Sequence, residues 1–138
     1  MATGQCLCGK VRYEVEGPFG DVTFCHCQMC RRANGTAFSA NSTVPRSGYS
    51  LLSGRDVIKE YESSPGEFRS FCSNCGSPVY SRLASRPDHI RLRLGGLSGA
   101  FSVNVIGHIW VESKADWYPI CDDLPQYEGS FPQDRSPR

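Results

Sequence analysis

Eight cysteines in a chain of 138 residues constrain its fold more than any other feature. The N-terminus lacks the apolar region of a secretory signal, and no stretch approaches the roughly 20 apolar residues of a membrane helix. We therefore expect a cytoplasmic protein without a membrane span. In that reducing compartment, cysteines more often bind metals or catalyse reactions than form disulfides. By spacing they fall into four groups: Cys6 and Cys8; Cys25, Cys27 and Cys30; Cys72 and Cys75; and Cys121 alone.

The first and third groups together make a ligand set for one metal ion. Side chains at i and i+2 of a strand point the same way, so Cys6 and Cys8 can bind one ion from one face. Gly9 and Gly76 each follow the second cysteine of their pair, where a glycine lets the backbone turn sharply at positive φ. Four thiolates form the closed tetrahedral set of a structural zinc site. We predict that this set is Cys6, Cys8, Cys72 and Cys75; free buried thiols are the alternative.

The second group offers three thiolates and no evident fourth. Cys25 and Cys27 are expected on one face of a strand, with Cys30 at the start of a short helix. Three protein ligands and an exchangeable fourth position are typical of catalytic zinc, so we predict two zinc ions per chain. His26 should point away from this metal, behind the ligands or at the surface, although it could also be a ligand. Cys121 could close the site, which would make both zincs structural, or remain an ordinary free thiol.

A zinc site of three thiolates favours sulfur chemistry over the activation of water. The thiolates donate strongly to the ion, which reduces its Lewis acidity relative to a site of three histidines. Such a soft site suits a thiol substrate, bound as a thiolate and placed to attack an aldehyde or to leave a thiohemiacetal. The added negative charge needs compensation, and Arg31 or Arg32 could lie near the metal or bind a substrate carboxylate. As solvated helix residues they would do neither. His108 is a candidate for proton transfer.

Short alternating runs of apolar and polar residues dominate the remainder of the chain. Such runs, closed by turn residues, predict half-buried strands, here at 11–15, 20–25, 36–43, 57–62, 67–72, 78–84, 90–94 and 106–112. Residues 28–34 alone favour a short helix. We therefore predict a mainly β protein of two packed, mostly antiparallel sheets with one short helix. A single domain should span residues 1–132, followed by a loose tail at 133–138.

Four motifs, in this order, resemble the glutathione-dependent formaldehyde-activating enzyme family, which also includes centromere protein V. The motifs are Gly4-x-Cys6-x-Cys8-Gly9-x-Val11, Cys25-His26-Cys27-x2-Cys30-Arg31-Arg32-x2-Gly35, Phe71-Cys72-x2-Cys75-Gly76 and His108-Ile109-Trp110-Val111. The resemblance covers about residues 4–120 and implies a Mss-four-like fold of coiled antiparallel sheets. It implies the same division of the cysteines between a structural and a catalytic zinc. It also implies carbon–sulfur chemistry: the condensation of glutathione with formaldehyde to S-hydroxymethylglutathione.

These observations lead to one principal functional hypothesis and two alternatives. The principal hypothesis is a zinc-dependent carbon–sulfur lyase that acts on a thiol–aldehyde adduct, with a small thiol such as glutathione as its partner. Its candidate substrate-binding residues are Arg31, Arg32 and His108. The first alternative is a non-catalytic, zinc-stabilised binding module. The net charge of +1 and the scattered distribution of the charged residues argue against nucleic acid as its partner. The second is redox sensing or iron binding by the same thiolates. The sequence gives no indication of the oligomeric state.

Overall fold

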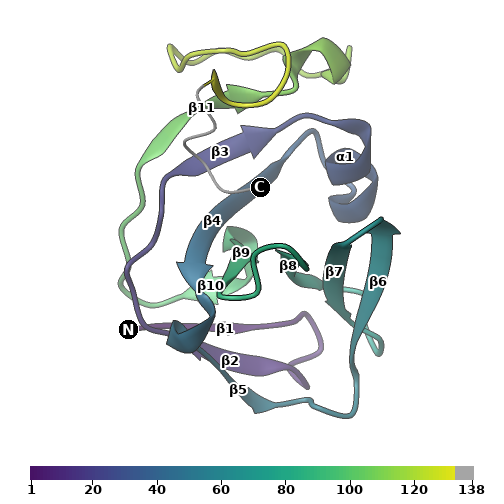
Figure 1. The fold of residues 1–138 in the computed structure, drawn as a ribbon, viewed down its shortest axis with the longest axis vertical. Helices are drawn as coiled ribbons and strands as arrows, with labels where there is room; N and C mark the ends of the chain where they lie inside the picture. The colour runs from purple at the N-terminus through teal and green to yellow at the C-terminus, as the bar shows by residue number, and fades with distance from the viewer. Residues whose placement is uncertain (133–138) are drawn as a thin grey trace.

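Two β-sheets make up the computed structural model, which describes residues 1–132 (Figure 1). The smaller sheet has four strands in the order β10-β1-β2-β5, and the larger has seven in the order β11-β3-β4-β9-β8-β7-β6. Paired strands are antiparallel except β11 and β3, which run parallel. The strands are β1 (Ala2–Gln5), β2 (Arg12–Val15), β3 (Val22–Cys25), β4 (Ser39–Pro45), β5 (Tyr49–Ser53), β6 (Ile58–Ser64), β7 (Glu67–Cys72), β8 (Pro78–Leu83), β9 (His89–Arg93), β10 (Leu97–Ser98) and β11 (Val105–Ile109).

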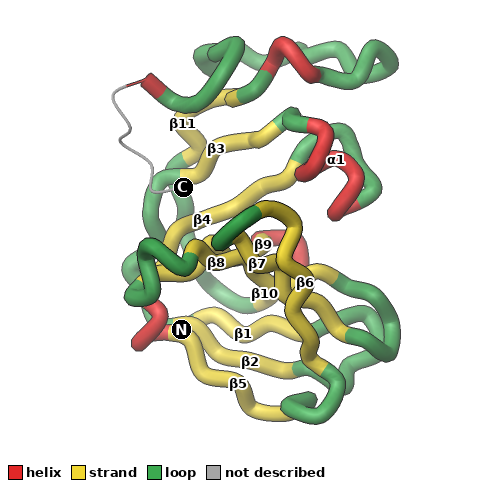
Figure 2. The backbone as a smooth tube through the Cα atoms, turned by 45° about the vertical axis from the view of Figure 1, so that its right-hand side comes forward, coloured by secondary structure: helices red, strands yellow, loops and turns green. Residues whose placement is uncertain are grey.

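A single α-helix, α1 (Gln28–Asn34), occurs in the described part of the chain and follows β3 almost directly (Figure 2). Cys27 is its N-cap residue, and Gly35 ends it with a left-handed φ of 67°. Glycine suits this position because it lacks the Cβ that makes positive φ costly. Short 3-10 turns also occur among residues 1–132: η1 (Arg46–Gly48), η2 (Leu94–Gly96) and η3 (Val111–Ser113).

The main hydrophobic core lies between the two sheets. Ile90 and Leu92 of β9 are fully buried and belong to the same cluster as Val44 of β4. The small sheet contributes Tyr13 and Val15 of β2 to this cluster. Burial of an apolar side chain of this size stabilises the fold by about 1.5–3 kcal/mol relative to exposure. The alternating pattern therefore predicts correctly which face of β2 and of β9 meets the opposite sheet.

The other face of the seven-stranded sheet is polar, and much of it is also enclosed. Arg93 lies opposite Asn41 in the register, and its side chain donates hydrogen bonds to Asn41 and Ser81. Arg93 is only 5% exposed. The pairing places a band of such residues across β3, β4, β9, β8 and β7: Thr23, Asn41, Arg93, Arg91, Ser81 and Arg69. Side chains of this polar band line two cavities that are described below.

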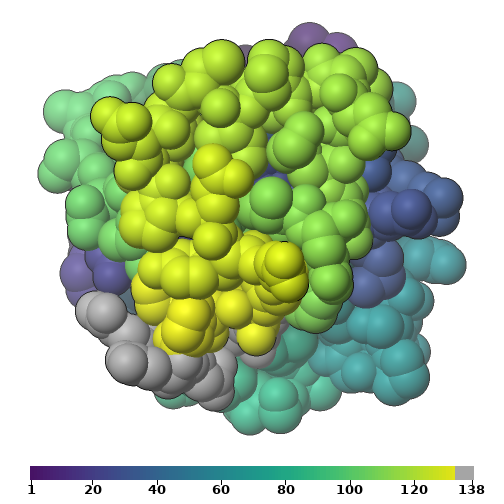
Figure 3. Space-filling view, turned by 90° about the horizontal axis from the view of Figure 1, so that it is seen from above, coloured from purple at the N-terminus to yellow at the C-terminus, as the bar shows by residue number. Residues whose placement is uncertain are grey.

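The chain beyond β11 covers one end of the molecule. Figure 3 shows this segment, yellow-green to yellow, spread over that end. Its backbone is tied to β11 by hydrogen bonds from Tyr127 N to His108 O and from Trp110 N to Gly129 O. Trp110 has a φ of 57°, so β11 ends at Ile109 rather than at the predicted residue 112. The predicted loose tail at 133–138 lies outside the described residues.

The predicted fold class is confirmed. The structure is mainly β, and its helix spans the predicted residues 28–34. Strands β1, β5 and β10 were not predicted, because they are short or lack a clear apolar alternation. The parallel pairing of β11 with β3 is the exception to the predicted antiparallel arrangement. None of the helices in the described residues has the length and apolar character needed to cross a membrane.

Candidate metal centres

Two clusters of cysteines have the geometry to hold a metal ion. In the larger, the thiol sulfurs of Cys6, Cys8, Cys72 and Cys75 lie within 4.8 Å of one another. The Cys8 sulfur is 3.5 Å from that of Cys6 and 3.9 Å from that of Cys72. Zn–S bonds of about 2.3 Å in tetrahedral geometry separate sulfurs by about 3.8 Å. The four thiols therefore fit zinc in both type and spacing.

Turns, rather than strand alternation, bring these thiols together. β1 ends at Gln5, so the prediction that Cys6 and Cys8 share a strand face is wrong. Positions i and i+2 of a strand are about 6.6 Å apart along the strand. Two side chains that extend perpendicular to the strand at that separation are too far apart to bind one ion. The turn instead closes through Gly9 N to Cys6 O at 3.1 Å. Gly9 and Gly76 have φ values of 79° and 83°, as predicted for glycines that follow a metal-binding pair.

The second cluster consists of Cys25, Cys27 and Cys30, whose sulfurs also lie within 4.8 Å of one another. Cys25 ends β3, Cys27 caps α1, and Cys30 lies in the first turn of that helix. Cys25 and Cys27 therefore do not share a strand face, contrary to the prediction. In the described residues no other cysteine, histidine or carboxylate joins the cluster. Cys121 is exposed, and its thiol points to the Pro119 carbonyl oxygen.

The surroundings of Cys30 favour its thiolate, whereas the neighbouring thiols and then burial raise the pKa of Cys25 and of Cys27. Hydrogen bonds from the thiols of Cys25 and Cys27, and then from the Ser39 hydroxyl, hold the pKa of Cys30 well below its usual range. The charge of Arg69 lowers it further. Deprotonated thiolates are the form that binds metals. Three thiolates form a soft donor set that suits zinc, and they come from one short segment of chain.

Three arginines of the polar band surround the cluster, and the sequence analysis did not single them out. Arg69, Arg91 and Glu67 line a cavity of about 50 Å³ together with the three cysteines. Glu67 pairs with Arg91 and, at 3.7 Å, with Arg69. Arg93 lies near enough to Cys30 for their charges to interact, and burial lowers the pKa of Arg93 to about 10. Three arginines and one glutamate together carry a net positive charge, which offsets the negative charge of the thiolates.

A chain of hydrogen bonds connects the second cluster to the C-terminal segment. His26 is fully buried, and its Nε2 lies 2.8 Å from Nδ1 of His108. His108 is also fully buried, and its Nε2 lies 3.0 Å from a carboxylate oxygen of Asp122. Burial, followed by repulsion from the neighbouring basic side chains, lowers the pKa of His26 to about 4. His26 is thus neither at the surface nor in the ligand set, and both nitrogens of His108 are engaged within the protein.

The two predicted substrate-binding arginines lie on another side of α1. Arg31 and Arg32 line a hollow of about 270 Å³ with Gln28, Thr36 and Trp117. Arg31 Nη1 donates a hydrogen bond to the Ser113 carbonyl at 2.9 Å, which ties the helix to the C-terminal segment. Trp117 is 69% exposed and forms an open wall of this hollow. Neither arginine lines the cavity that contains the three cysteines.

The fold and its two cysteine clusters define a small β protein with one four-thiolate and one three-thiolate candidate metal centre. Residues 1–113 match the family described as glutathione-dependent formaldehyde-activating enzyme. The chain belongs to this family, as its motifs indicated.

Two relatives illustrate this similarity. A protein of Schizosaccharomyces pombe named as an uncharacterized lyase is 25% identical over 126 residues, which cover 90% of this chain and 88% of that protein. The crystal structure of a Rhodobacter sphaeroides protein, a structural genomics target, is also similar, with a TM-score of 0.62 and 25% sequence identity. The similarity covers 77% of this chain and 98% of the Rhodobacter chain. Both similarities therefore span most of the length of the related protein.

Proposed function

We propose that the protein is a zinc-dependent carbon–sulfur lyase with two zinc ions per chain. Cys6, Cys8, Cys72 and Cys75 would hold a structural zinc, and Cys25, Cys27 and Cys30 a catalytic one. The observation that carries the proposal is the three-thiolate cluster itself, which lines a cavity and has no fourth ligand among the described residues. A structural site normally completes four protein ligands, whereas a catalytic site keeps one position for a substrate.

The proposed reaction joins or separates a thiol and an aldehyde. In the forward direction the thiol sulfur bonds to the carbonyl carbon, and the proton lost by the thiol ends on the new hydroxyl group. When bound, zinc with three thiolate ligands offers a soft fourth position that holds a thiol as its thiolate at neutral pH. Membership of the family supports glutathione as the thiol and formaldehyde as the aldehyde, and the relative named as a lyase supports the class of reaction.

The residues around the cluster would provide charge and position. Arg69, Arg91 and Arg93 supply positive charge where a substrate thiolate would add a negative one. Arg31 and Arg32 remain candidates for substrate contact through the hollow that they line with Trp117. His108 would act as a positioning residue through His26, because its two ring nitrogens are already hydrogen-bonded.

Two measurements on the zinc-loaded protein test this function. NMR exchange between a free thiol and its hydroxymethyl adduct should accelerate when formaldehyde, glutathione and the protein are mixed. Zinc-edge X-ray absorption should show one additional sulfur per chain when the thiol saturates the site. Cys27→Ser should abolish both effects, whereas Cys121→Ser, which alters an exposed thiol outside the cluster, should preserve them. An unchanged sulfur count and no acceleration with any thiol in a small panel would favour the non-catalytic binding module.

A further inference from the structure

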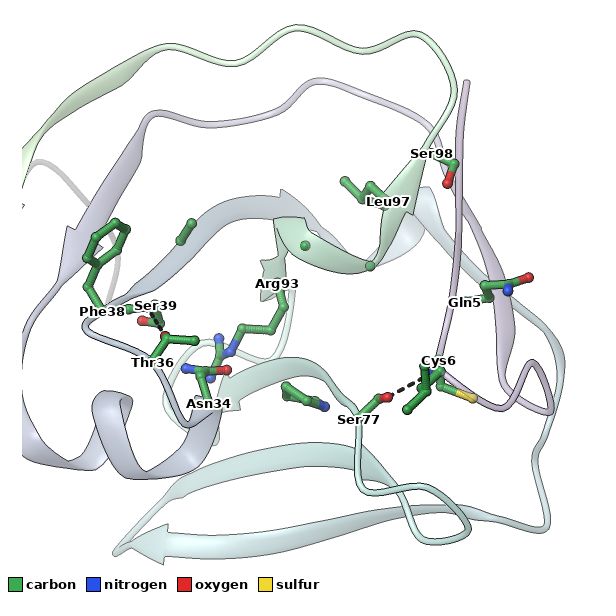
Figure 4. Close-up of a pocket in the computed structure, with 15 residues that line it drawn as sticks. Gln5, Cys6, Asn34, Thr36, Phe38, Ser39, Ser77, Arg93, Leu97 and Ser98 are labelled. Atoms are coloured by element: carbon green, nitrogen blue, oxygen red, sulfur yellow. Dashed lines mark hydrogen bonds between the residues drawn. The ribbon is translucent and has the colours of Figure 1, made fainter.

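A second cavity adjoins the three-thiolate cluster and is separate from the small one that the cysteines line. Its volume is about 610 Å³, and it lies between the Cys6 turn, the end of α1 and the η2 turn (Figure 4). Small-molecule sites typically measure about 300–1,000 Å³. Ser39 connects the two features, because it lines the large cavity and lies opposite Cys25 in the register of β3 and β4. A molecule in this cavity would therefore lie beside the candidate catalytic centre.

Arg93 is the only arginine, lysine or carboxylate among the described residues that line this cavity. Its side chain extends toward Asn34 and Ser39, as Figure 4 shows. Every hydrogen bond that Arg93 donates to the described residues starts at Nη1, with Asn41, Ser81 and the Arg91 carbonyl as acceptors. The Nε has no acceptor among them but is buried out of reach of the cavity. Nη2 donates to none of them either, so the guanidinium retains free donors on Nη2.

No carboxylate of the described residues forms an ion pair with Arg93, although it is only 5% exposed. A buried guanidinium is costly when no carboxylate pairs with it directly, because the charge has lost its water. The Cys30 thiolate and Glu67 offset part of this cost, whereas Arg69 and Arg91 carry the same sign and add to it. A free guanidinium N–H donates a charge-assisted hydrogen bond to a carboxylate, which would also supply the missing carboxylate partner.

We propose that this cavity is the binding site for a carboxylate of the substrate, and that Nη2 of Arg93 donates the hydrogen bond that holds it. The protein would therefore select thiols that carry a carboxylate over neutral thiols. The ligand's identity as a thiol rests on the proposed function, whereas the carboxylate site rests on Arg93 and the cavity alone. Polar groups at Asn34, Thr36 and Ser39 line the same space and would orient the remainder of the ligand.

Calorimetry with S-methylglutathione tests the site independently of the reaction, because its blocked sulfur cannot form a thiolate. We expect the zinc-loaded protein to bind this thioether at least tenfold more tightly than its diamide, in which both carboxylates are neutral. Charge-assisted hydrogen bonds of this kind account for about 10- to 100-fold in affinity. Equal affinities for the acid and the diamide, or no binding of the acid at millimolar concentration, would overturn the proposal.

Two variants locate the site, and a third serves as their control. Arg93→Gln should remove the preference for the acid over the diamide, whereas Arg55→Gln, at an exposed arginine outside the cavity, should keep it. Gly95→Leu should weaken binding of both ligands by filling the cavity. Gly95 lines that space and a Cβ there meets no atom within 4 Å, so this variant should fold even where Arg93→Gln does not. Undiminished binding to Gly95→Leu would place the ligand elsewhere and contradict the proposal.

The outcomes also separate this proposal from the proposed function. A protein that binds the acid through Arg93 but accelerates no thiol–aldehyde exchange would refute the lyase and retain the carboxylate site. A protein that catalyses the exchange equally well with glutathione and with its diamide would retain the lyase and refute the carboxylate site.

Discussion

His26 Nε2 lies 2.8 Å from His108 Nδ1, and this contact joins the loop of the three-cysteine cluster to the C-terminal segment. His26 stands between the ligand candidates Cys25 and Cys27, while His108 lies in β11 and contacts Asp122. The Asp122 carboxylate can only accept, so it fixes the proton of neutral His108 on Nε2. Nδ1 of His108 is then an acceptor, and His26 must donate from Nε2. One exposed carboxylate thereby sets the tautomers of two buried rings.

His108→Phe tests this arrangement. The phenyl ring keeps most of the volume but leaves the buried Nε2–H of His26 without an acceptor. Loss of one buried partner should reduce the free energy of unfolding by about 1–3 kcal/mol. His89→Phe alters a partly exposed histidine that pairs only with exposed Asp88, and should change stability by less than about 0.5 kcal/mol. Urea denaturation measures both, and equal stabilities of the two variants would show that the buried contact contributes little.

The strand pattern was sufficient to predict the fold class but not the surroundings of the site. Alternation in β9 correctly indicated that Ile90 and Leu92 face the core. The same alternation assigns Arg91 and Arg93 to a polar face, and a polar face is ordinarily taken to be solvated. Here helix α1 and the neighbouring strands enclose that face. Such tertiary packing cannot be predicted from the local periodicity of the sequence. The preponderance of arginine over lysine among the basic residues was the available signal.

The cysteine groups could be predicted because ligand spacing is local, whereas the path of the chain between them could not. The expected sets of four and three thiols are the sets that the structure brings together. Their backbone was predicted wrongly at Cys8 and Cys27, which lie in a turn and at a helix cap. Asp122 was not singled out, because its partner His108 lies 14 residues away across a β-bridge and an irregular segment.

Loss of metal should affect stability very differently at the two clusters. The four-thiolate set links Cys8 to Cys72 across 64 positions, so an ion there would close a long loop. The three-thiolate set spans only the short stretch from Cys25 to Cys30, where little chain entropy is at stake. Cys72→Ser should lower the free energy of unfolding by about 3 kcal/mol or more, and Cys27→Ser by clearly less. Thermal denaturation with zinc analysis checks this, and each variant should retain one zinc per chain.

Glu60 should make part of the stability dependent on pH. Two hydrogen bonds from Arg82, at 2.7 and 2.8 Å, hold the pKa of Glu60 below its ordinary value of 4.5. A pKa that is depressed on folding gives stability that is present above the unfolded value and is lost as pH falls through the folded one. The stability difference between the wild type and Glu60→Gln should therefore be constant from pH 7 to about pH 5 and shrink below it. Both proteins lose zinc in acid. The difference between their free energies of unfolding, measured by urea denaturation, should therefore report the contribution of Glu60.

Gly54→Ala should be far more harmful than Gly35→Ala, although both glycines have positive φ. A Cβ at Gly35 would meet no atom within 4 Å, so only the left-handed backbone costs energy, about 1 kcal/mol. A Cβ at Gly54 would lie 2.6 Å from the Lys10 carbonyl oxygen and 2.7 Å from the Val11 Cα, both backbone atoms. We expect a loss of about 3 kcal/mol or more at Gly54. Similar denaturation midpoints for the two variants would contradict this packing.

Arg69 should influence the use of thiol substrate more than the fold. Its charge helps to hold the pKa of Cys30 low, and it lines the small cavity with the three cysteines. Arg69→Gln removes a positive charge from the place where a substrate thiolate would bind, so KM for the thiol should rise about tenfold, equivalent to about 1.4 kcal/mol. Arg69→Lys keeps the charge and should recover most of that affinity. Arg86→Gln alters an exposed arginine outside this cavity and should leave KM unchanged. If Arg69→Gln lowers kcat and stability but leaves KM unchanged, then Arg69 supports the sheet through Glu67 and not the substrate.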